Sequence, residues 1–171
     1  MKIGIVGFGT VGSAMARLFS LGTAHSVVVY DKYLDHLSSP GNRRDINLSD
    51  LVFLCVPTPS ALSDGSCDTS IVDECVEWIQ PPICIRSTAV PGTVDRLIAK
   101  TGKSIAFSPE YLGEQPGHPW AEEHSCGFLI VGGSPDVCDK VAVAFAAVPG
   151  HTIEVHKTSA RSNRSAPLPL E

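Results

Sequence analysis

The chain contains no apolar run that approaches the roughly 20 residues needed by a membrane-spanning helix. Its amino end, "MKIGIVGFG", also lacks the long uninterrupted apolar stretch of a signal peptide. Basic residues are in the minority, since 13 Lys and Arg stand against 18 Asp and Glu and leave a net charge of −5. We therefore expect a cytoplasmic protein that binds neither membranes nor nucleic acid, because it would repel anionic partners.

The six cysteines show no CxxC spacing, which favours buried, reduced thiols over a metal site or a disulfide framework. His118, His124 and Cys126 lie close together in the sequence. Their spacing matches none of the common zinc patterns, so we expect no metal site.

A length of 171 residues suits one domain with a substantial core and is too short for two full-sized domains. No internal repeat is present. The last residues, "KTSARSNRSAPLPLE", have no apolar periodicity. We expect one domain over residues 1–156, followed by a disordered or truncated tail over 157–171.

Short apolar runs alternate with segments of helical period, which is typical of strand-helix units around a parallel sheet. The expected strands cover residues 2–6, 26–30, 51–56, 83–86, 104–107, 128–131 and 152–155. Helices are expected over residues 11–21 and 70–79, the second with a capping-box-like start at Ser70 and Asp73, and from Ser134 onward. Between residues 32 and 50 we expect only a short helix near Tyr33 to Leu37, because "SSPGN" breaks the chain.

A glycine motif follows the first expected strand and opens the first helix. Gly7, Gly9 and Gly12 stand in the GxGxxG pattern, which suits a tight turn, close approach of a pyrophosphate and close packing of helix on strand. The helix amino end would then face the phosphates. The motif predicts a doubly wound α/β fold of the Rossmann type that binds a dinucleotide. The alternative is that the glycines only form a turn.

Asp31 ends the second expected strand, 19 residues after Gly12. An acid at this place accepts hydrogen bonds from a ribose 2′-hydroxyl and repels a 2′-phosphate, which favours NAD over NADP. The nearby cations Lys32, Arg43 and Arg44 keep NADP open. A methyltransferase would also have glycines after its first strand and an acid after its second, so the ends of the later strands must distinguish the two.

Polar residues follow the third, fourth and fifth expected strands in "CVPTPS", "RSTAVPGT" and "SPEYLGE". Because the carboxyl ends of parallel strands share one edge of the sheet, these segments should converge on the glycine loop. The side chains concerned are Thr58, Ser87, Thr88, Glu110 and Glu114. The alternative is that the hydroxyls cap helices or close turns and that the glutamates form a solvated helical turn.

With these segments in view, the chain resembles the NAD-binding domain of the UDP-glucose and GDP-mannose dehydrogenase family. "GFGTVG", "CVPTP", "DGSCDTS", "RSTAVPGT" and "SPEYLGE" are similar to that family's segments, in its order, over roughly residues 1–156. The resemblance implies an enzyme that oxidises the primary alcohol of a nucleotide sugar of the UDP-glucose or GDP-mannose type to the acid, using NAD twice.

The resemblance also implies roles for residues. Thr88 would help to place water or substrate, and Glu110 and Glu114 match the family's two active-site glutamates, which handle protons and position groups. The cofactor-binding residues would be Gly7, Phe8, Gly9, Thr10, Val11, Gly12, Asp31, Lys32, Pro57, Thr58, Ser87 and Thr88. The oligomeric state stays open.

In the family, a catalytic cysteine with a supporting lysine and asparagine comes later, in a central helix and a sugar-nucleotide domain. We expect none of the six cysteines to replace it; Cys55 is near the correct edge but inside an apolar strand, where a thiol is inert. The expectation is a chain that binds NAD without completing the oxidation. Two alternatives are a stand-alone NAD(P)-binding or regulatory module without turnover, and a dehydrogenase of small hydroxy acids, which would not explain "SPEYLGE".

Overall fold

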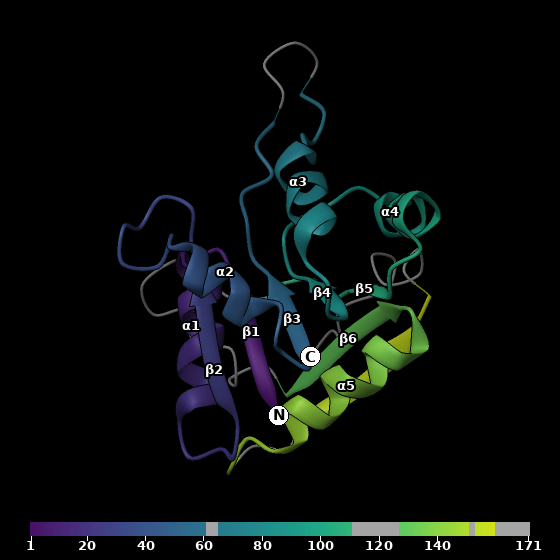
Figure 1. The fold of residues 1–171 in the computed structure, drawn as a ribbon. Coiled ribbons are helices and arrows are strands. Elements are labelled where there is room, and N and C mark those ends of the chain that lie inside the picture. Colours follow the sequence, from purple (N-terminus) through teal and green to yellow (C-terminus); the bar gives the residue numbers. More distant parts are fainter. Residues whose placement is uncertain (61–64, 111–126, 151–152, 160–171) are drawn as a thin grey trace.

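A computed structural model of the protein describes residues 1–60, 65–110, 127–150 and 153–159. Within these residues the strands form one seven-stranded sheet in the order β2-β1-β3-β4-β5-β6-β7 (Figure 1). The strands are β1 (Lys2–Val6), β2 (Ser26–Tyr30), β3 (Leu51–Leu54), β4 (Ile83–Ile85), β5 (Ile105–Phe107), β6 (Phe128–Gly133) and β7 (Glu154–Thr158). The helices are α1 (Thr10–Ser20), α2 (Pro40–Ile46), α3 (Ser70–Trp78), α4 (Thr93–Thr101) and α5 (Pro135–Ala146).

The sheet is mainly parallel. Among the strand pairs of the described residues, β5 and β6 alone run antiparallel, and β6 and β7 are parallel again. The central strands β3, β4 and β5 are buried along their whole length, as expected for strands that are covered on both faces. The predicted doubly wound α/β fold is confirmed.

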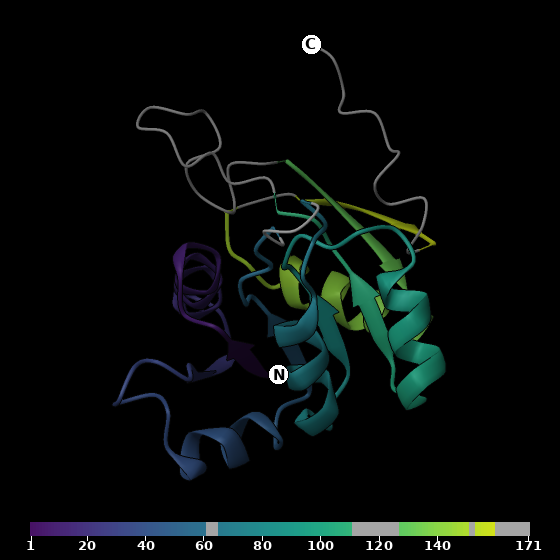
Figure 2. The same cartoon turned by 90° about the horizontal axis from the view of Figure 1, so that it is seen from above.

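Helices cover both faces of the sheet (Figure 2). On one face α1 and α5 pack against the strands through Phe19 and Phe145, whose rings meet edge to face at 5.2 Å between centroids. On the other face α2, α3 and α4 bury Ile46, Val72 and Leu97. The two apolar clusters hold the sheet as the middle layer of three.

The connection after β2 differs from the prediction. The expected helix near Tyr33 to Leu37 is wrong, and α2 begins instead at the segment that was expected to break the chain. Ser39 caps it, since its hydroxyl accepts a hydrogen bond from the Asn42 amide at 3.1 Å, and Pro40 occupies the first helical turn, where its missing N–H has no cost.

Other boundaries also shift. The helix α4, which was not predicted, follows the "VPG" turn and buries Val94 and Leu97. The strand β3 ends at Leu54, two residues earlier than expected. The strand β7 continues to Thr158, past the expected domain boundary. Thr69, rather than Ser70, is the N-cap residue of α3.

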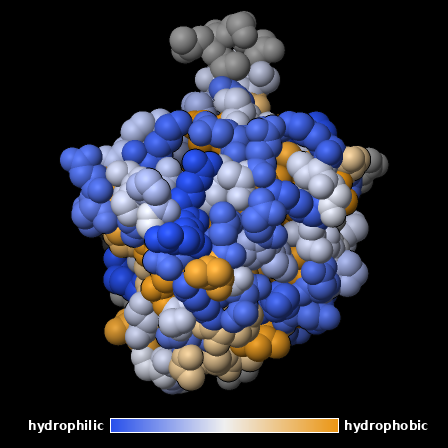
Figure 3. All heavy atoms as spheres, in the orientation of Figure 1, coloured by the Kyte–Doolittle hydropathy of each residue, from blue (hydrophilic) through white to orange (hydrophobic). Residues whose placement is uncertain are grey.

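The face seen in Figure 3 is mainly hydrophilic, with apolar residues scattered over it.

Three cysteines, Cys75, Cys84 and Cys138, are buried in the core. No helix in the described part of the chain is both long and apolar enough to cross a membrane.

Candidate functional site

The chain reverses its direction across the sheet between β1 and β3. From β1 it passes outward to β2, and it then returns to β3 on the other side of β1. Ligands of open α/β sheets bind outside the carboxyl ends of the strands at such a point. A cleft of about 580 Å³ lies there, lined by Gly7, Phe8, Gly9, Thr10, Val11, Asp31, Tyr33, Cys55, Val56, Pro57, Thr58, Arg86, Ser87, Thr88 and Glu110. Its size is in the range of small-molecule sites.

Two of the three motif glycines are required by the fold itself. Gly7 has a φ of +89°, and a Cβ there would lie 2.5 Å from the carbonyl oxygen of Cys55. A Cβ on Gly12 would lie 1.9 Å from the carbonyl oxygen of Gly7, because α1 packs closely on the turn. These two glycines would be necessary with or without a ligand.

Gly9 is different. It is the N-cap of α1, with an ordinary φ of −76°. Apart from its two neighbours in the chain, no described residue has an atom within 4 Å of the place where its Cβ would be. The fold therefore does not explain this glycine, whereas a pyrophosphate lying close to the backbone would explain it. The first turn of α1, which the structure describes completely, carries no acidic side chain that would compete with a phosphate. The residues present thus fit a dinucleotide.

Asp31 connects the end of β2 with the glycine loop. Its Oδ2 accepts a hydrogen bond from the Phe8 amide at 2.7 Å, and its Oδ1 accepts one from the Tyr33 amide at 2.8 Å. Both oxygens are therefore held in place. Because a carboxylate oxygen accepts more than one hydrogen bond, Asp31 retains capacity for ribose hydroxyls at the edge of the cleft.

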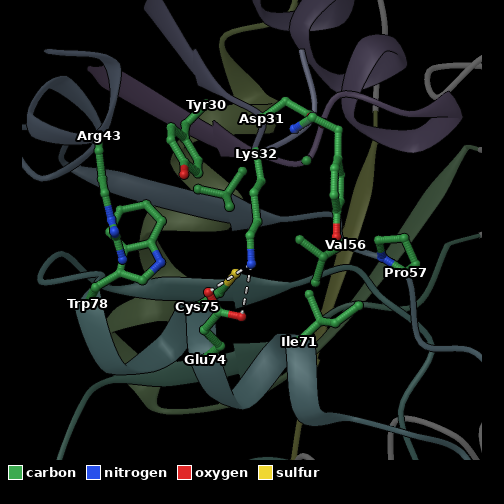
Figure 4. A pocket seen from close by; sticks show the side chains of 13 residues that line it. Tyr30, Asp31, Lys32, Arg43, Val56, Pro57, Ile71, Glu74, Cys75 and Trp78 are labelled. Carbon is green, nitrogen blue, oxygen red and sulfur yellow. Dashed lines mark hydrogen bonds and ion pairs between the residues drawn. The ribbon is translucent and has the colours of Figure 1, made fainter. Parts of the chain in front are cut away.

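A smaller hollow of about 80 Å³, the side slot, opens beside the cleft and shares five lining residues with it: Gly7, Asp31, Tyr33, Val56 and Pro57. Figure 4 shows it between the end of β2 and α3. Trp78 forms one wall; the ring of Tyr30 meets it edge to face at 5.3 Å, and the guanidinium carbon of Arg43 lies 4.2 Å from its ring centroid. These apolar and aromatic walls fit a flat heteroaromatic ring.

Cys75 also lines the side slot. Burial raises the pKa of its thiol to about 11. The thiol is therefore neutral at physiological pH and contributes an apolar surface rather than a nucleophile.

At the other end of the cleft the later strands contribute polar groups. Thr88 is exposed, whereas Ser87 is buried and donates its hydroxyl hydrogen bond to the carbonyl oxygen of Leu54 at 3.3 Å. That bond supports the turn-closing alternative for Ser87. Thr58 and Glu110, which follow the ends of β3 and β5, line the same cleft.

Arg86 was not predicted as a site residue, and it organises this end. Its side chain is 1% exposed; Nη1 donates to Ser108 Oγ at 2.8 Å and Nη2 to Glu110 Oε2 at 2.7 Å. Glu110, which is 16% exposed, is thus held at the rim of the cleft. The signal in the sequence was a charged residue directly after the apolar run "ICI", where burial requires a partner.

The structure brings most of the predicted residues together. Lys32 lines the side slot rather than the cleft, and Gly12 lies beneath the glycine loop without lining either hollow. Cys55 was expected inside a strand; because β3 ends early, it follows the strand and lines the cleft. Glu114 lies outside the described residues. That these residues bind a cofactor or act in catalysis stays a prediction.

No group of three or more His, Cys, Asp or Glu side chains in the described ranges could hold a metal ion. His118, His124 and Cys126 lie outside those ranges. The expectation that these three residues form no metal site therefore stays a prediction.

Residues 38–145, more than half of the chain, match the model of the UDP-glucose/GDP-mannose dehydrogenase family, NAD binding domain. The chain belongs to this family. The predicted resemblance is confirmed, and a nicotinamide cofactor is the ligand expected in the cleft. No curated protein sequence matches the chain significantly.

Solved structures of nucleotide-sugar dehydrogenases have the same fold. A UDP-glucose dehydrogenase from Pyrobaculum islandicum matches with a TM-score of 0.75 and 20% identity, over 96% of this chain and 47% of that one. A GDP-mannose dehydrogenase from Pseudomonas aeruginosa matches with 0.75 and 18%, over 96% and 48%. A UDP-D-ManNAc dehydrogenase from Pyrococcus horikoshii matches with 0.70 and 20%, over 96% and 49%. The chain spans about half the length of these proteins.

Proposed function

We propose that the chain binds NAD in the cleft between β1 and β3 and forms the cofactor-binding part of a nucleotide-sugar dehydrogenase. The reaction would oxidise the primary alcohol of a sugar of the UDP-glucose or GDP-mannose type to the carboxylate. The observation that carries the proposal is the open space beside Gly9, at the amino end of α1 and next to Asp31. The fold alone does not require a glycine at position 9.

The dinucleotide would lie across the point where the chain reverses. Its pyrophosphate would approach the loop of Gly7 to Val11, and its adenosine would enter the side slot, with the ribose against Asp31. Its other half would extend past Pro57 and Thr58 toward Ser87 and Thr88. When bound, a nicotinamide cofactor supplies the acceptor for the hydride that the alcohol loses.

The residues of this chain would handle the proton and the position of the substrate. Thr88 is exposed at the cleft and offers a hydroxyl to water or substrate. The Glu110 carboxylate, held by Arg86 at 2.7 Å, is a candidate for proton handling. Glu114, also assigned by resemblance, is a candidate of the same kind. We propose no nucleophilic thiol.

Asp31 supports NAD as the preferred dinucleotide. Its carboxylate is fixed by two backbone amides, so it could not turn away from a phosphate on the ribose, and like charges would repel.

Two measurements test the proposal. Titration calorimetry of the purified chain with NAD should show binding to one site, and Gly9→Ala should weaken it. In a second experiment the chain is mixed with NAD and UDP-glucose or GDP-mannose, and the absorbance of NADH is followed. Absence of NAD binding would overturn the proposal. Binding of NAD without NADH from any nucleotide sugar, even when a separate chain that supplies the rest of the enzyme is added, would favour the alternative of a nucleotide-binding module without turnover.

A further inference from the structure

Two opposite charges follow each other at the end of β2. Asp31 should reject a phosphate on the adenosine ribose, whereas the ammonium of Lys32 is a group that attracts one. Both residues line the side slot. The preference between NAD and NADP therefore depends on what holds Lys32.

Glu74 on α3 holds it. The Lys32 Nζ lies 3.3 Å from Glu74 Oε1 and 3.5 Å from Oε2, and Figure 4 shows the pair across the side slot. Both side chains are 58% exposed. The pKa of Lys32 is raised, first by its hydrogen bond to Glu74, so the ammonium stays charged at neutral pH.

The charges around the side slot are balanced. The charged side chains that line it are Asp31, Lys32, Arg43 and Glu74, and they sum to zero. Arg43 lies over the ring of Trp78, and Asp31 is fixed by the amides of Phe8 and Tyr33. An exposed ion pair such as Lys32–Glu74 is of modest strength, so a phosphate could recruit Lys32 only at the cost of breaking its pair with Glu74.

We propose that Glu74 is a positioning residue for cofactor specificity: by pairing with Lys32 it keeps that ammonium from a ribose phosphate and so favours NAD over NADP. The inference rests on the proposed binding of NAD in the cleft. Glu74 acts through Lys32 and adds to the repulsion that Asp31 exerts directly.

The test is the ratio of the dissociation constants for NADP and NAD, measured by titration calorimetry. Glu74→Gln should lower this ratio about threefold to tenfold, because Lys32 is released and the side slot loses one negative charge. This gain in relative affinity for NADP should shrink between about 50 mM and 500 mM NaCl, since exposed charges are screened. Adding Lys32→Gln to Glu74→Gln should abolish the gain.

Glu77→Gln is the matched control. Glu77 also lies on α3, is 62% exposed and pairs with Lys100 at 3.0 Å, but it does not line the side slot. Its substitution makes the same change in net charge and should leave the ratio unchanged.

An unchanged ratio in Glu74→Gln, an equal change in Glu77→Gln, or a gain that survives in the double variant would each overturn the inference while NAD binding stands. Wild-type protein that binds neither nucleotide would overturn the proposed function and this inference with it.

Discussion

Arg86 and Glu110, which both line the cleft, form an ion pair with Arg86 Nη2 2.7 Å from Glu110 Oε2. The arginine is almost fully buried and the glutamate reaches the rim. Because the buried Arg86 holds Glu110, the candidate for proton handling, the pair contributes both to the stability of the domain and to the position of a site residue.

Removal of the Arg86 guanidinium should therefore destabilise the protein. We expect Arg86→Met to lower the free energy of unfolding in urea by about 2 to 4 kcal/mol, because the Glu110 carboxylate loses a charged partner at a partly buried position. Glu110→Gln should cost less, since an amide oxygen still accepts a hydrogen bond. The double variant completes a double-mutant cycle, which should give a coupling free energy of about 1 kcal/mol or more between Arg86 and Glu110. Additive effects of the two substitutions on the free energy of unfolding would contradict this coupling.

The motif glycines should separate into two classes. Gly9→Ala is expected to change the free energy of unfolding by less than about 1 kcal/mol and to weaken NAD binding by about tenfold or more, because the methyl group enters the space beside the helix end. Gly12→Ala should destabilise the fold by on the order of 3 kcal/mol through its clash with Gly7. Thermal unfolding and calorimetry measure the two effects. Equal affinity of Gly9→Ala and wild type for NAD would show that the glycine loop is not part of the binding site.

Asp31→Ala should weaken NAD binding and narrow its advantage over NADP. The same substitution also leaves the Phe8 amide without its carboxylate partner, so a loss of about 1 kcal/mol in unfolding free energy should accompany it. Asp31→Asn is the control, since it removes the charge and keeps an acceptor oxygen. Calorimetric titrations with NAD and NADP measure both affinities, and unchanged affinity for both would exclude Asp31 from the binding site.

The pair of Asp73 and Arg96 should contribute to stability in a pH-dependent way. The pKa of Asp73 is lowered from its ordinary value of 3.8, first by the hydrogen bonds from Arg96, at 2.6 and 2.8 Å. A carboxyl whose pKa is lower in the folded state contributes stability above its unfolded pKa and loses that contribution as the pH falls through the folded pKa.

Urea unfolding of wild type and Asp73→Asn at several pH values tests this. The variant should be less stable at pH 7, by no more than about 1 kcal/mol because Arg96 is 47% exposed. The difference should shrink below about pH 3.8. A difference that stays constant across the acid range would show that Asp73 does not act through its charge.

Much of the fold followed from local pattern. The bounds of β1 and β2 agree with the expected ranges, because apolar runs between turn residues identify strands well. The connection after β2 was wrong, since "SSPG" is compatible with both a break and a helix start, and the burial of Ile46 under the sheet decides for the helix. The early end of β3, which brings Cys55 into the cleft, could not be read from a continuous apolar run.

The glycine motif, the acid at the end of the second strand and the order of apolar segments are local features. The sequence alone therefore specifies the fold class and predicts the sheet edge at which a dinucleotide would bind. Two relationships needed the tertiary structure: Arg86 with Glu110, 24 residues apart, and Lys32 with Glu74, 42 residues apart. Such pairs depend on how strands and helices from distant parts of the chain pack together. Periodicity along a single segment carries no information about that packing, whereas the sheet order brings the groups within hydrogen-bonding distance.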